Sequence, residues 1–576
     1  MKKYLTALCF LSLLKVFSQD FITPFERSQG TETATYEEGI EFYQKLASHY
    51  PEIKVFEYGT TDIGKPLHLV VFSEDRDFNP ASLKAKNKTI FLIINAIHPG
   101  EPDGVDASMM LLRDVVQNNK FRKMCKNTIL AIIPFYNVDG ALQRNSFSRA
   151  NQNGPKSYGF RANAKNLDLN RDFIKMDSEN AKTFVKIFQT WQPDVQIDNH
   201  VTNGADYQYT MTYIFANPVL YAPDMQSYFL KEFKPDLLNL MKKKGEEMCP
   251  YVETRKNIPD SGLVQNVRSP RFSHIYATQF HTLALVAETH MLKPFDKRVW
   301  ATYKMMLSIL EILEKDGIKI QRNRKKSFEY FQKQEKLVLD WKINETKPTM
   351  IDFKGYEAEF VTSNVTGLLR LRYNTQKPYT KKIPYYETHE PKLIIQKPKM
   401  YIIPRAYVNI VKMLEMNGVQ ITRFTKKETF KGFYYYIKDF KTPKYPYEGH
   451  YFHYDIEVEK KPDTYTLQEG DFVVMTNQPH INFIMNVLEP QAPDSYFAWN
   501  FFDTILQQKE YFSDYVFEDI AEKLLAENPT LRAEFEAKKR NDAEFAQSSS
   551  KQLDFIYKNS PYYEKHHQRY PIFRVE

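Results

Sequence analysis

Two residues that could hold a metal ion stand where a long apolar run ends. The segment "FLIINAIHPGEPDG" (91–104) turns polar at His98-Pro99-Gly100-Glu101. Because Pro99 and Gly100 keep the chain from continuing as a strand, both side chains are delivered at the carboxyl end of a predicted strand, where ligands of open α/β sheets gather. His98 and Glu101 therefore suggest half of a zinc site. The alternative is a surface turn with a helix-capping acid.

The third ligand is expected from another strand. A catalytic zinc ion usually has three protein ligands and one position left for water. His200 ends the strand-like run "PDVQIDNH" (193–200) and so reaches the same edge of the sheet. Alone, His200 could be a hydrogen-bonded histidine at a strand end. Together with His98 and Glu101 it forms a plausible ligand set.

Two further segments add polar groups to this edge. "NLDLNRDF" (166–173) contains Asp168, Asn170 and Arg171. An acid can orient a metal-binding imidazole, and an amide with a guanidinium can hold a carboxylate; the alternative is a surface loop with salt bridges. Glu288 follows the apolar run of "LALVAET". An unpaired carboxylate there is costly unless it has a partner or a catalytic role.

The elements that must position these groups are predicted from apolar runs. Strands are expected at 67–72, 89–97, 128–137, 193–200 and 283–289, and helices at 104–119 and 178–191. Several strand runs are continuously apolar, which is typical of strands buried on both faces of a mainly parallel sheet covered by helices. The sequence therefore predicts an α/β fold with a mixed, mainly parallel sheet flanked by helices.

A chain of 576 residues predicts more than one domain. We expect a catalytic domain at 30–325, a charged linker at 326–348 and a mixed α/β accessory domain of unknown type and role at 349–576. Residues 1–18 have a basic start, a short apolar middle and a small residue at the end, which predicts a signal peptide rather than a buried helix. The protein is then exported, to the periplasm or the medium, with no transmembrane segment after signal removal.

Charge and cysteine content exclude other classes. A net charge of +8 without a dense basic block argues against nucleic acid as a partner. Cys125 and Cys249, which remain after the signal is removed, could form one disulfide, but their pairing is left open. His450 and His453 in "GHYFHYD" could suggest a second metal site. Their odd separation places them on opposite faces of a strand, so a structural role is preferred.

Taken together, "HPGE", "NLDLNRD", the strand-terminal histidine and "VAETH" occur in an order that resembles the zinc carboxypeptidases of the carboxypeptidase A type, over about residues 30–320. The resemblance implies one Zn²⁺ per chain and a peptide or protein substrate with a free C-terminal carboxylate. The implied roles are zinc ligation by His98, Glu101 and His200, orientation of the first histidine by Asp168, carboxylate binding by Asn170 and Arg171, and acid-base catalysis by Glu288.

The resemblance also implies an arginine that stabilises the oxyanion. Arg149 in "NSFSRANQ" is chosen because it follows "NVDG", and Arg144 and Arg161 are its rivals. Arg271 is expected to bind substrate; if it enters the side-chain pocket, acidic terminal residues are favoured, and otherwise it is a surface arginine. The family's tyrosine over the terminal carboxylate has no secure counterpart, because Tyr276 lies too near the catalytic acid in the sequence.

Two alternative functions stay open. One is a zinc amidase or endopeptidase of the same fold that acts on cell-wall peptides or N-acyl amino acids; the amide and guanidinium of "NLDLNRD" favour a free carboxylate in the substrate but do not exclude it. The other is a non-catalytic peptide-binding protein, which would be expected to lack a ligand or the catalytic acid. The competing zinc motif H-E-x-x-H is absent from the sequence.

Overall fold

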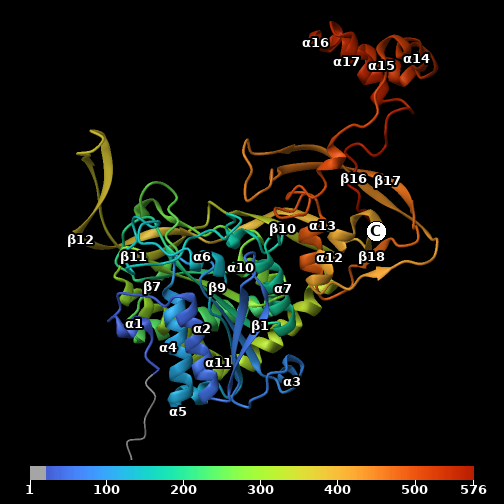
Figure 1. The fold of residues 1–576 in the computed structure, drawn as a ribbon. Helices are drawn as coiled ribbons and strands as arrows, with labels where there is room; N and C mark the ends of the chain where they lie inside the picture. The colour runs from blue at the N-terminus through green and yellow to red at the C-terminus, as the bar shows by residue number, and fades with distance from the viewer. Residues whose placement is uncertain (1–20) are drawn as a thin grey trace, which may run out of the picture. The chain divides into compact units, whose positions relative to one another are not determined.

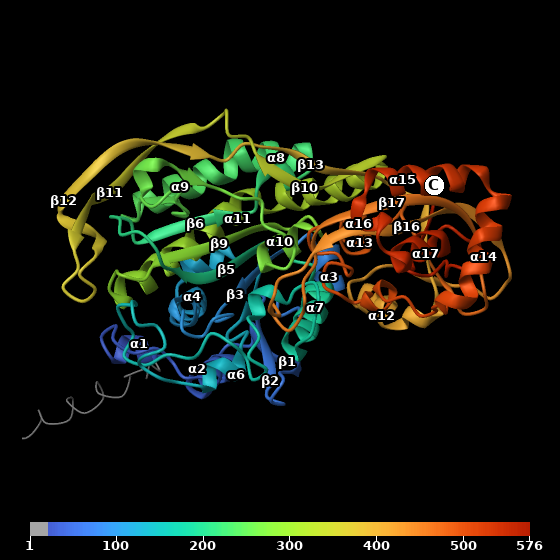
Figure 2. The same ribbon diagram turned by 90° about the horizontal axis from the view of Figure 1, so that it is seen from above.

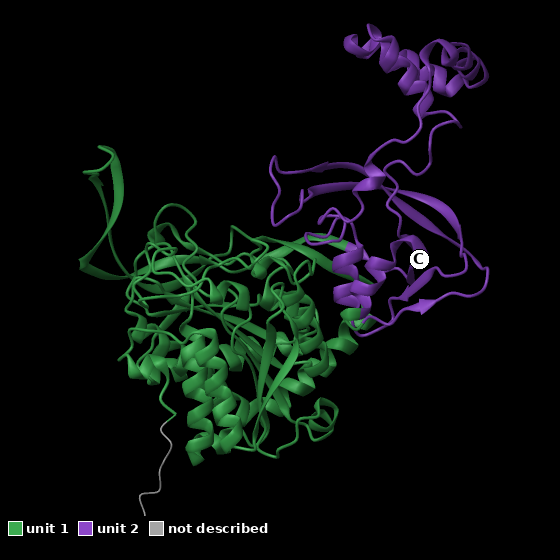
Figure 3. Ribbon diagram, in the orientation of Figure 1, with its two compact units in different colours: residues 1–394, 416–418 green, residues 395–415, 419–576 purple. Residues whose placement is uncertain are grey.

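The computed structural model describes residues 21–576, so the predicted signal peptide lies outside the described residues. The chain divides into two compact units (Figure 3): one runs to Ile394 and includes Met416–Gly418, and the other comprises Ile395–Glu415 and Val419–Glu576. Among residues 21–576, no helix is long and apolar enough to cross a membrane.

An eight-stranded mixed sheet forms the centre of the first unit (Figures 1 and 2), with the order β1-β2-β4-β3-β5-β9-β6-β7. The strands are β1 (Ile53–Thr60), β2 (Pro66–Phe72), β3 (Thr89–Ile94), β4 (Thr128–Ile133), β5 (Val195–Thr202), β6 (Met211–Phe215), β7 (Met248–Pro250) and β9 (Leu283–His290). The four central strands β4, β3, β5 and β9 are parallel. The prediction of a mixed, mainly parallel sheet is confirmed.

Every residue of β3, β4 and β5 is buried, as the continuously apolar sequences of β3 and β4 require, whereas β5 buries polar side chains that include Asp198 and His200. The helices around the sheet are α1 (Pro24–Arg27), α2 (Tyr36–His49), α3 (Pro80–Ala85), α4 (Asp103–Gln117), α5 (Asn119–Met124), α6 (Val138–Leu142), α7 (Glu179–Trp191), α8 (Pro223–Tyr228), α9 (Lys234–Lys243), α10 (Ser273–Thr278) and α11 (Phe295–Lys333). Helices α4 and α11 pack together along the sheet, α7 contacts β1 and β2, and α10 contacts β5 and β9.

Strand β3 ends three residues before its predicted end. Ala96 has a φ of 53°, in the left-handed region that a residue with a side chain rarely adopts. Asn95 fixes this turn: its Nδ2 donates to Ser108 Oγ at 3.0 Å, and its Oδ1 accepts from Asn199 Nδ2 at 2.8 Å. The chain therefore leaves the sheet before His98.

The structure places the domain boundary elsewhere than the sequence predicted. Residues 326–348, expected to be a linker, instead lie largely in the end of α11 and in strand β10 (Lys336–Ile343), both in the first unit. Strands β11 (Thr349–Thr362) and β12 (Leu369–Tyr386) pair with β8 (Leu263–Val264) in a three-stranded sheet. Phe353 and Ile383 pack with Tyr207 and Leu263 in one core cluster, so this hairpin also belongs to the first unit.

The second unit is built on a six-stranded antiparallel sheet with the order β15-β18-β14-β19-β16-β17. These strands are β14 (Met400–Ile403), β15 (Thr422–Arg423), β16 (Thr429–Lys441), β17 (Tyr454–Thr466), β18 (Phe472–Met475) and β19 (Phe573–Val575). The helices include α12 (Val408–Met416), α13 (Ile481–Leu488), α14 (Asp514–Glu527), α15 (Pro529–Asn541), α16 (Ala543–Ala546) and α17 (Ser549–Lys558). Strand β13 (His389–Gln396), most of which belongs to the first unit, pairs with β10. The expectation of a mixed α/β region is confirmed.

A buried ion pair holds the last strand of the second unit. Arg574 and Glu489 are each 1% exposed, and Arg574 Nη1 donates to both carboxylate oxygens of Glu489 at 2.8 Å. The hydroxyl of Tyr401 donates to the same carboxylate. An ion pair this deeply buried is stabilising only while both partners are present.

Candidate metal centre and active site

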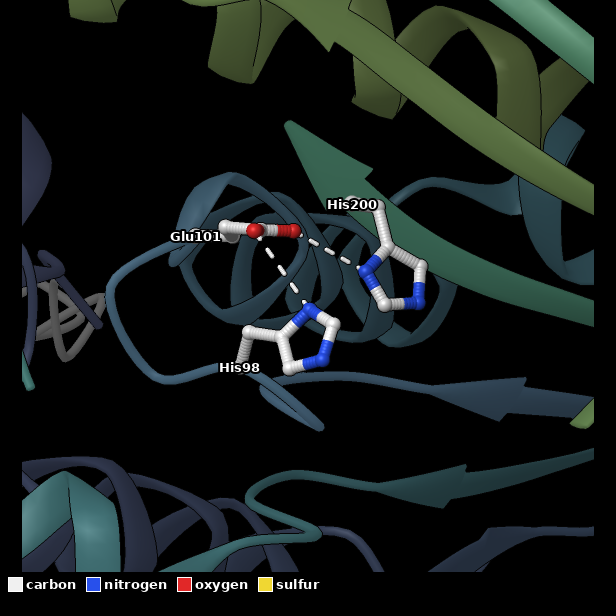
Figure 4. A group of neighbouring side chains, drawn as sticks. All are labelled: His98, Glu101 and His200. Carbon is white, nitrogen blue, oxygen red and sulfur yellow. Dashed lines mark hydrogen bonds and ion pairs between the residues drawn. The ribbon is translucent and has the colours of Figure 1, made fainter. Parts of the chain in front are cut away.

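Three side chains from two strand ends converge on one point of the first unit (Figure 4). His98 and Glu101 lie in the turn between β3 and α4, and His200 lies near the end of the neighbouring strand β5. All three are 4% exposed. One ligand atom from each lies within 4.8 Å of the others, so the group could hold one metal ion.

The two histidines present the same ring nitrogen to this point. His98 Nε2 lies 2.9 Å from Asp168 Oδ1, and His200 Nε2 lies 2.9 Å from Asp198 Oδ2. The Nδ1 atoms face Glu101, at 3.4 Å for His98 and 2.9 Å for His200. His98 Nδ1 is buried and makes no hydrogen bond in the described structure. Buried polar atoms without partners are rare, and an unprotonated ring nitrogen can bind a metal ion, so this set fits a metal cation.

The electrostatics of the three residues also fit a cation. Although burial favours the neutral acid, Arg149, His98 and His200 hold the pKa of Glu101 well below its usual range. Burial likewise opposes charge on His200, yet Asp198 and Glu101 hold the pKa of His200 well above its ordinary value. Negative charge around the histidines therefore attracts either a proton or a metal ion, which compete for the same nitrogen.

Asp198 is a residue of the site that the sequence analysis missed. It is fully buried two residues before His200 on β5, and its Oδ2 also accepts a hydrogen bond from Ser273 Oγ. Side chains two apart on a strand lie on the same face. This spacing, together with the placement of an acid in a buried strand, was a signal that could have identified Asp198.

Glu288 lies beside His200 across the parallel pairing of β5 and β9, where the two residues are direct partners in register. Its carboxylate lines the same pocket as the three ligands and makes no hydrogen bond to any described residue. Burial, reinforced by the charges of Glu101 and Asp198 and opposed by that of His200, raises the pKa of Glu288 to about 8. A carboxylate in this position could accept a proton from water.

Asn170 and Arg171 belong to the short helix η1 (Leu169–Arg171), which Asp168 caps by accepting from Asn170 N at 2.9 Å. Asn170 Oδ1 accepts from Ser273 N at 3.1 Å, which fixes the amide plane. The guanidinium of Arg171 stacks over Phe272 with Cζ 4.3 Å from the ring centroid. Both side chains line the pocket, as a carboxylate-binding pair would require.

Two of the three candidate oxyanion arginines reach the pocket. Every nitrogen of the Arg149 guanidinium is hydrogen-bonded: Nε to Gln152, Nη1 to Glu101 at 2.7 Å and Nη2 to the Val201 carbonyl. The position of Arg149 also accounts for the glycine at residue 100, because a Cβ atom on Gly100 would lie 2.6 Å from Arg149 Cδ.

Arg161 is engaged differently. It donates to Asp168 through Nε and Nη2, while its Nη1 lies 3.5 Å from Glu101 and makes no hydrogen bond to the described part of the chain. Asn137 of "NVDG" holds the Arg161 carbonyl at 3.0 Å. Arg144 instead donates to backbone carbonyls of Thr33, Ala34 and Ser157 and does not line the pocket.

The chain is similar to known carboxypeptidases. Residues 40–211 match the family model described as zinc carboxypeptidase. The matched family model and the relatives support the zinc carboxypeptidase family for this chain. Carboxypeptidase 2 of Trichophyton rubrum is 21% identical over 497 residues, covering 81% of this chain and 84% of that protein. A probable carboxypeptidase 2 of Arthroderma benhamiae is 20% identical over 506 residues, covering 83% and 88%.

Solved structures of carboxypeptidases also align with the chain. The metallo-carboxypeptidase from Burkholderia cenocepacia has a TM-score of 0.36 at 17% identity and covers 48% of this chain and 68% of its own. Carboxypeptidase A from Helicoverpa armigera has a TM-score of 0.37 at 15% identity, covering 50% and 74%. The family and the enzyme class, a metallocarboxypeptidase hydrolase, are those predicted from the sequence.

The pocket does not include one of the residues expected to bind substrate. It is a cavity of about 210 Å³ above the three ligands, and Arg271 is not among the described residues that line it. Arg271 Nε instead lies 3.1 Å from Ser269 Oγ. Arg268, three residues earlier in the same loop, lines the cavity in its place.

The tyrosine that lines the pocket is Tyr251 and not Tyr276. Tyr276 is fully buried, and its hydroxyl donates to Asn417 at 2.7 Å, so it does not line the pocket. Tyr251 does line it, and burial with the nearby charge of Glu288 raises the pKa of Tyr251 to about 12. Tyr251 lies between His200 and Glu288 in the sequence and belongs to none of the predicted site motifs, which is why the sequence analysis did not find it.

The remaining candidates take no part in this site. Cys125 and Cys249 are buried free thiols. In the second unit, His453 lies 2.8 Å from Asp503 through Nε2 and 2.8 Å from Thr442 through Nδ1, and His450 Nδ1 lies 2.5 Å from Asn500. The two histidines have separate hydrogen-bond partners, and the metal-binding group found in the described residues is the one in the first unit.

Proposed function

We propose that this chain is an exported zinc-dependent metallocarboxypeptidase that hydrolyses the C-terminal peptide bond of peptides or proteins, with Glu288 as general base. One observation carries the proposal: the Glu288 carboxylate, the His98-Glu101-His200 group and the Asn170-Arg171 pair line a single pocket. A base, a metal centre and a carboxylate-binding pair at that spacing suit hydrolysis next to a free C-terminus.

The residues have the following roles in the proposed reaction. A bound zinc ion supplies Lewis-acid polarisation of the scissile carbonyl and makes a nearby water more acidic. Glu288 accepts the proton of the attacking water and passes it to the leaving amine. Asp168 and Asp198 hold the two imidazoles by their Nε2 atoms, so that both Nδ1 atoms stay turned toward the metal position.

Arg171 and Asn170 bind the terminal carboxylate and thereby select the last peptide bond. An arginine fork can bind a carboxylate through two parallel hydrogen bonds, which fixes its direction as well as its position. The stack of Arg171 on Phe272 limits the guanidinium to one orientation. Selection of the terminal bond is thus a matter of distance between this arginine and the metal centre.

For the oxyanion, the hydrogen bonding favours Arg161 over Arg149. Arg149 is fully engaged with Glu101, Gln152 and a backbone carbonyl, so it is better suited to orient Glu101. Arg161 Nη1 lies 3.5 Å from Glu101 and makes no hydrogen bond to a described residue, so its donors are less engaged than those of Arg149. A preorganised donor at the developing negative charge contributes most when it has no competing partner.

The export part of the proposal rests on the order of basic, apolar and small residues in positions 1–18. Expression of the full chain in a bacterial host, followed by fractionation and determination of the mature N-terminus, tests it directly. We expect the mature chain outside the cytoplasm with its first 18 or so residues removed. An intact N-terminus in the cytoplasm would contradict export.

The activity is tested with zinc-loaded protein and pairs of peptides that differ only in a free or an amidated C-terminus. We expect release of one C-terminal amino acid from the free acid and little from the amide, measured by mass spectrometry of the products. Equal cleavage of both forms would refute the carboxypeptidase proposal. Internal cuts would favour an endopeptidase or amidase of the same fold.

A further inference from the structure

We infer that the pocket selects peptides whose last residue is acidic, and that Arg268 is the cation that binds the side-chain carboxylate. The inference rests on the proposed carboxypeptidase function and names its substrate class. It is carried by four features of the pocket: an arginine with unused donors, its position beside Arg171, the signs of the surrounding charges, and a buried histidine with an unpaired nitrogen.

Arg268 is held in place but not saturated. Its Nη2 donates to Glu253 Oε2 at 3.0 Å, and the other oxygen of Glu253 accepts from Asn266 Nδ2 at 2.8 Å. The Nε and Nη1 atoms of Arg268 make no hydrogen bond in residues 21–576, and the side chain lines the pocket at 30% exposure. Glu253 therefore positions the guanidinium and leaves one edge of its fork for a ligand.

Arg268 and Arg171 sit around one aromatic ring. Their Cζ atoms lie 5.4 Å and 4.3 Å from the centroid of Phe272. If Arg171 binds the terminal carboxylate, Arg268 is a second cation beside the same ring, whereas Arg149 and Arg161 are paired with Glu101 and Asp168. A C-terminal aspartate or glutamate carries two carboxylates a few bonds apart, so the two arginines match its two charges.

The other charges of the pocket disfavour the remaining side-chain classes. The acids that line it among the described residues are Glu101 and Glu288, and both are committed to the metal and to proton transfer. A lysine or arginine side chain of the substrate would be repelled by Arg268, and the pocket would have no uncommitted acid to pair with it. An apolar side chain would cover Arg268 and remove water from its unused donors, which is unfavourable for a charged group.

His274 adds a second polar group to this wall. It lines the pocket, is 3% exposed, and its Nδ1 has no hydrogen-bond partner in the described structure. Burial and the charge of Arg268 lower the pKa of His274 to about 3, so the ring is neutral at physiological pH. A neutral imidazole offers one N–H donor and one acceptor. A polar side chain of the substrate can form a hydrogen bond with the buried ring nitrogen of His274, which an apolar side chain would leave unpaired.

The test measures kcat/KM for peptides that are identical except for their last residue, which is Glu, Gln, Asp, Asn, Leu or Lys. Glu and Gln have nearly the same shape, so their ratio reports the charge alone. A hydrogen bond to a charged group at a partly exposed site predicts about a 10- to 100-fold preference for Glu over Gln. The same preference is expected for Asp over Asn, with Lys hydrolysed least well.

Arg268→Gln should bring the ratio of kcat/KM for the Glu and Gln peptides to about one, and the circular dichroism spectrum of the variant checks that it is folded. Arg268→Lys, which keeps the charge but not the fork, should give an intermediate ratio. Arg271→Gln is the matched control: it removes an arginine of the same loop that does not line the pocket, and the Glu to Gln ratio should stay as in the unaltered protein.

The outcomes separate the inference from the function beneath it. Hydrolysis of free-acid peptides with equal rates for Glu and Gln, or with Leu or Lys preferred, would overturn the acidic specificity and leave the carboxypeptidase proposal standing. A preference for Glu that survives Arg268→Gln would overturn the role of Arg268. Failure to release a terminal residue from any peptide would refute the proposed function itself, and the inference with it.

Discussion

Replacement of Asp198 by asparagine is expected to weaken zinc binding, although Asp198 acts on the metal only through His200. The Asp198 carboxylate lies 2.9 Å from His200 Nε2, and both residues are under 5% exposed, so water cannot take over the contact. Loss of a carboxylate that orients a metal-binding histidine typically costs 10- to 100-fold in metal affinity. Asparagine keeps the shape and one acceptor oxygen, so we expect a value nearer tenfold, or about 1.4 kcal/mol.

The direction of the amide decides how large the loss becomes. If its oxygen faces His200, the tautomer with a proton on Nε2 is kept and Nδ1 stays available to the metal. If its NH₂ faces the ring, Nε2 must accept and the proton moves to Nδ1, which blocks the metal position. Asp198→Ala removes the contact altogether and should approach a 100-fold loss.

The assay titrates metal-free protein with Zn²⁺ against a competing chelator at fixed pH. Asp194→Asn is the matched control, because Asp194 is also buried and immediately precedes the other end of β5. It accepts from Ile90 N at 3.0 Å and touches none of the ligands, so its loss should lower stability without changing the zinc Kd. An Asp198→Asn protein that is folded and has an unchanged zinc Kd would refute the reasoning.

Four further predictions follow from the site and the fold. Glu288→Gln should bind zinc normally yet lose about 10²- to 10⁴-fold in kcat, measured by steady-state kinetics with metal analysis; undiminished turnover would exclude Glu288 as the base. Arg161→Gln should lower kcat by about 10²- to 10³-fold with little change in KM, whereas Arg149→Gln should mainly weaken zinc binding. The reverse pattern would show that Arg149 stabilises the oxyanion. Since burial raises the pKa of Glu288 to about 8 and zinc lowers it again, kcat/KM should fall as the pH drops through an apparent pKa below 8; a limb above 8 would contradict this. Glu489→Gln should destabilise the second unit by about 3–5 kcal/mol in chemical denaturation, against less than about 1 kcal/mol for the exposed Glu459→Gln, and equal effects would refute the buried pair.

The central strands could be predicted because each signal is local. The runs in β3 and β4 are apolar without alternation, which a strand covered on both faces requires. Once these strands are parallel, their carboxyl ends meet at one edge, and His98, Glu101 and His200 come together there. The pairing of Glu288 with His200 follows from the same arrangement.

The domain boundary could not be predicted because composition does not report what a segment contacts. The end of α11 is rich in lysine and arginine, which suggested a linker, yet Ile320, Asn323 and Ser327 on the same helix are buried. Strand β12 pairs with β8, more than a hundred residues earlier in the chain. No local pattern specifies a partner at that separation.

The residues that line the substrate pocket could not all be predicted from the sequence either. Arg268 and Arg271 lie in one loop with no periodicity, so nothing local decides which of them turns inward. Glu253 and Phe272 settle it through contacts made only in the folded chain. Asp198 differs, because the strand alternation with His200 placed it on the ligand face and could have been used.

The most direct test of the metal centre is a crystal structure of the zinc-loaded protein with anomalous data collected at the zinc edge. We predict one strong peak per chain in the first unit, bound by Glu101 and by the Nδ1 atoms of His98 and His200, with both Nε2 atoms still held by Asp168 and Asp198. Zinc bound through Nε2, or a single peak away from these three residues, would contradict the account.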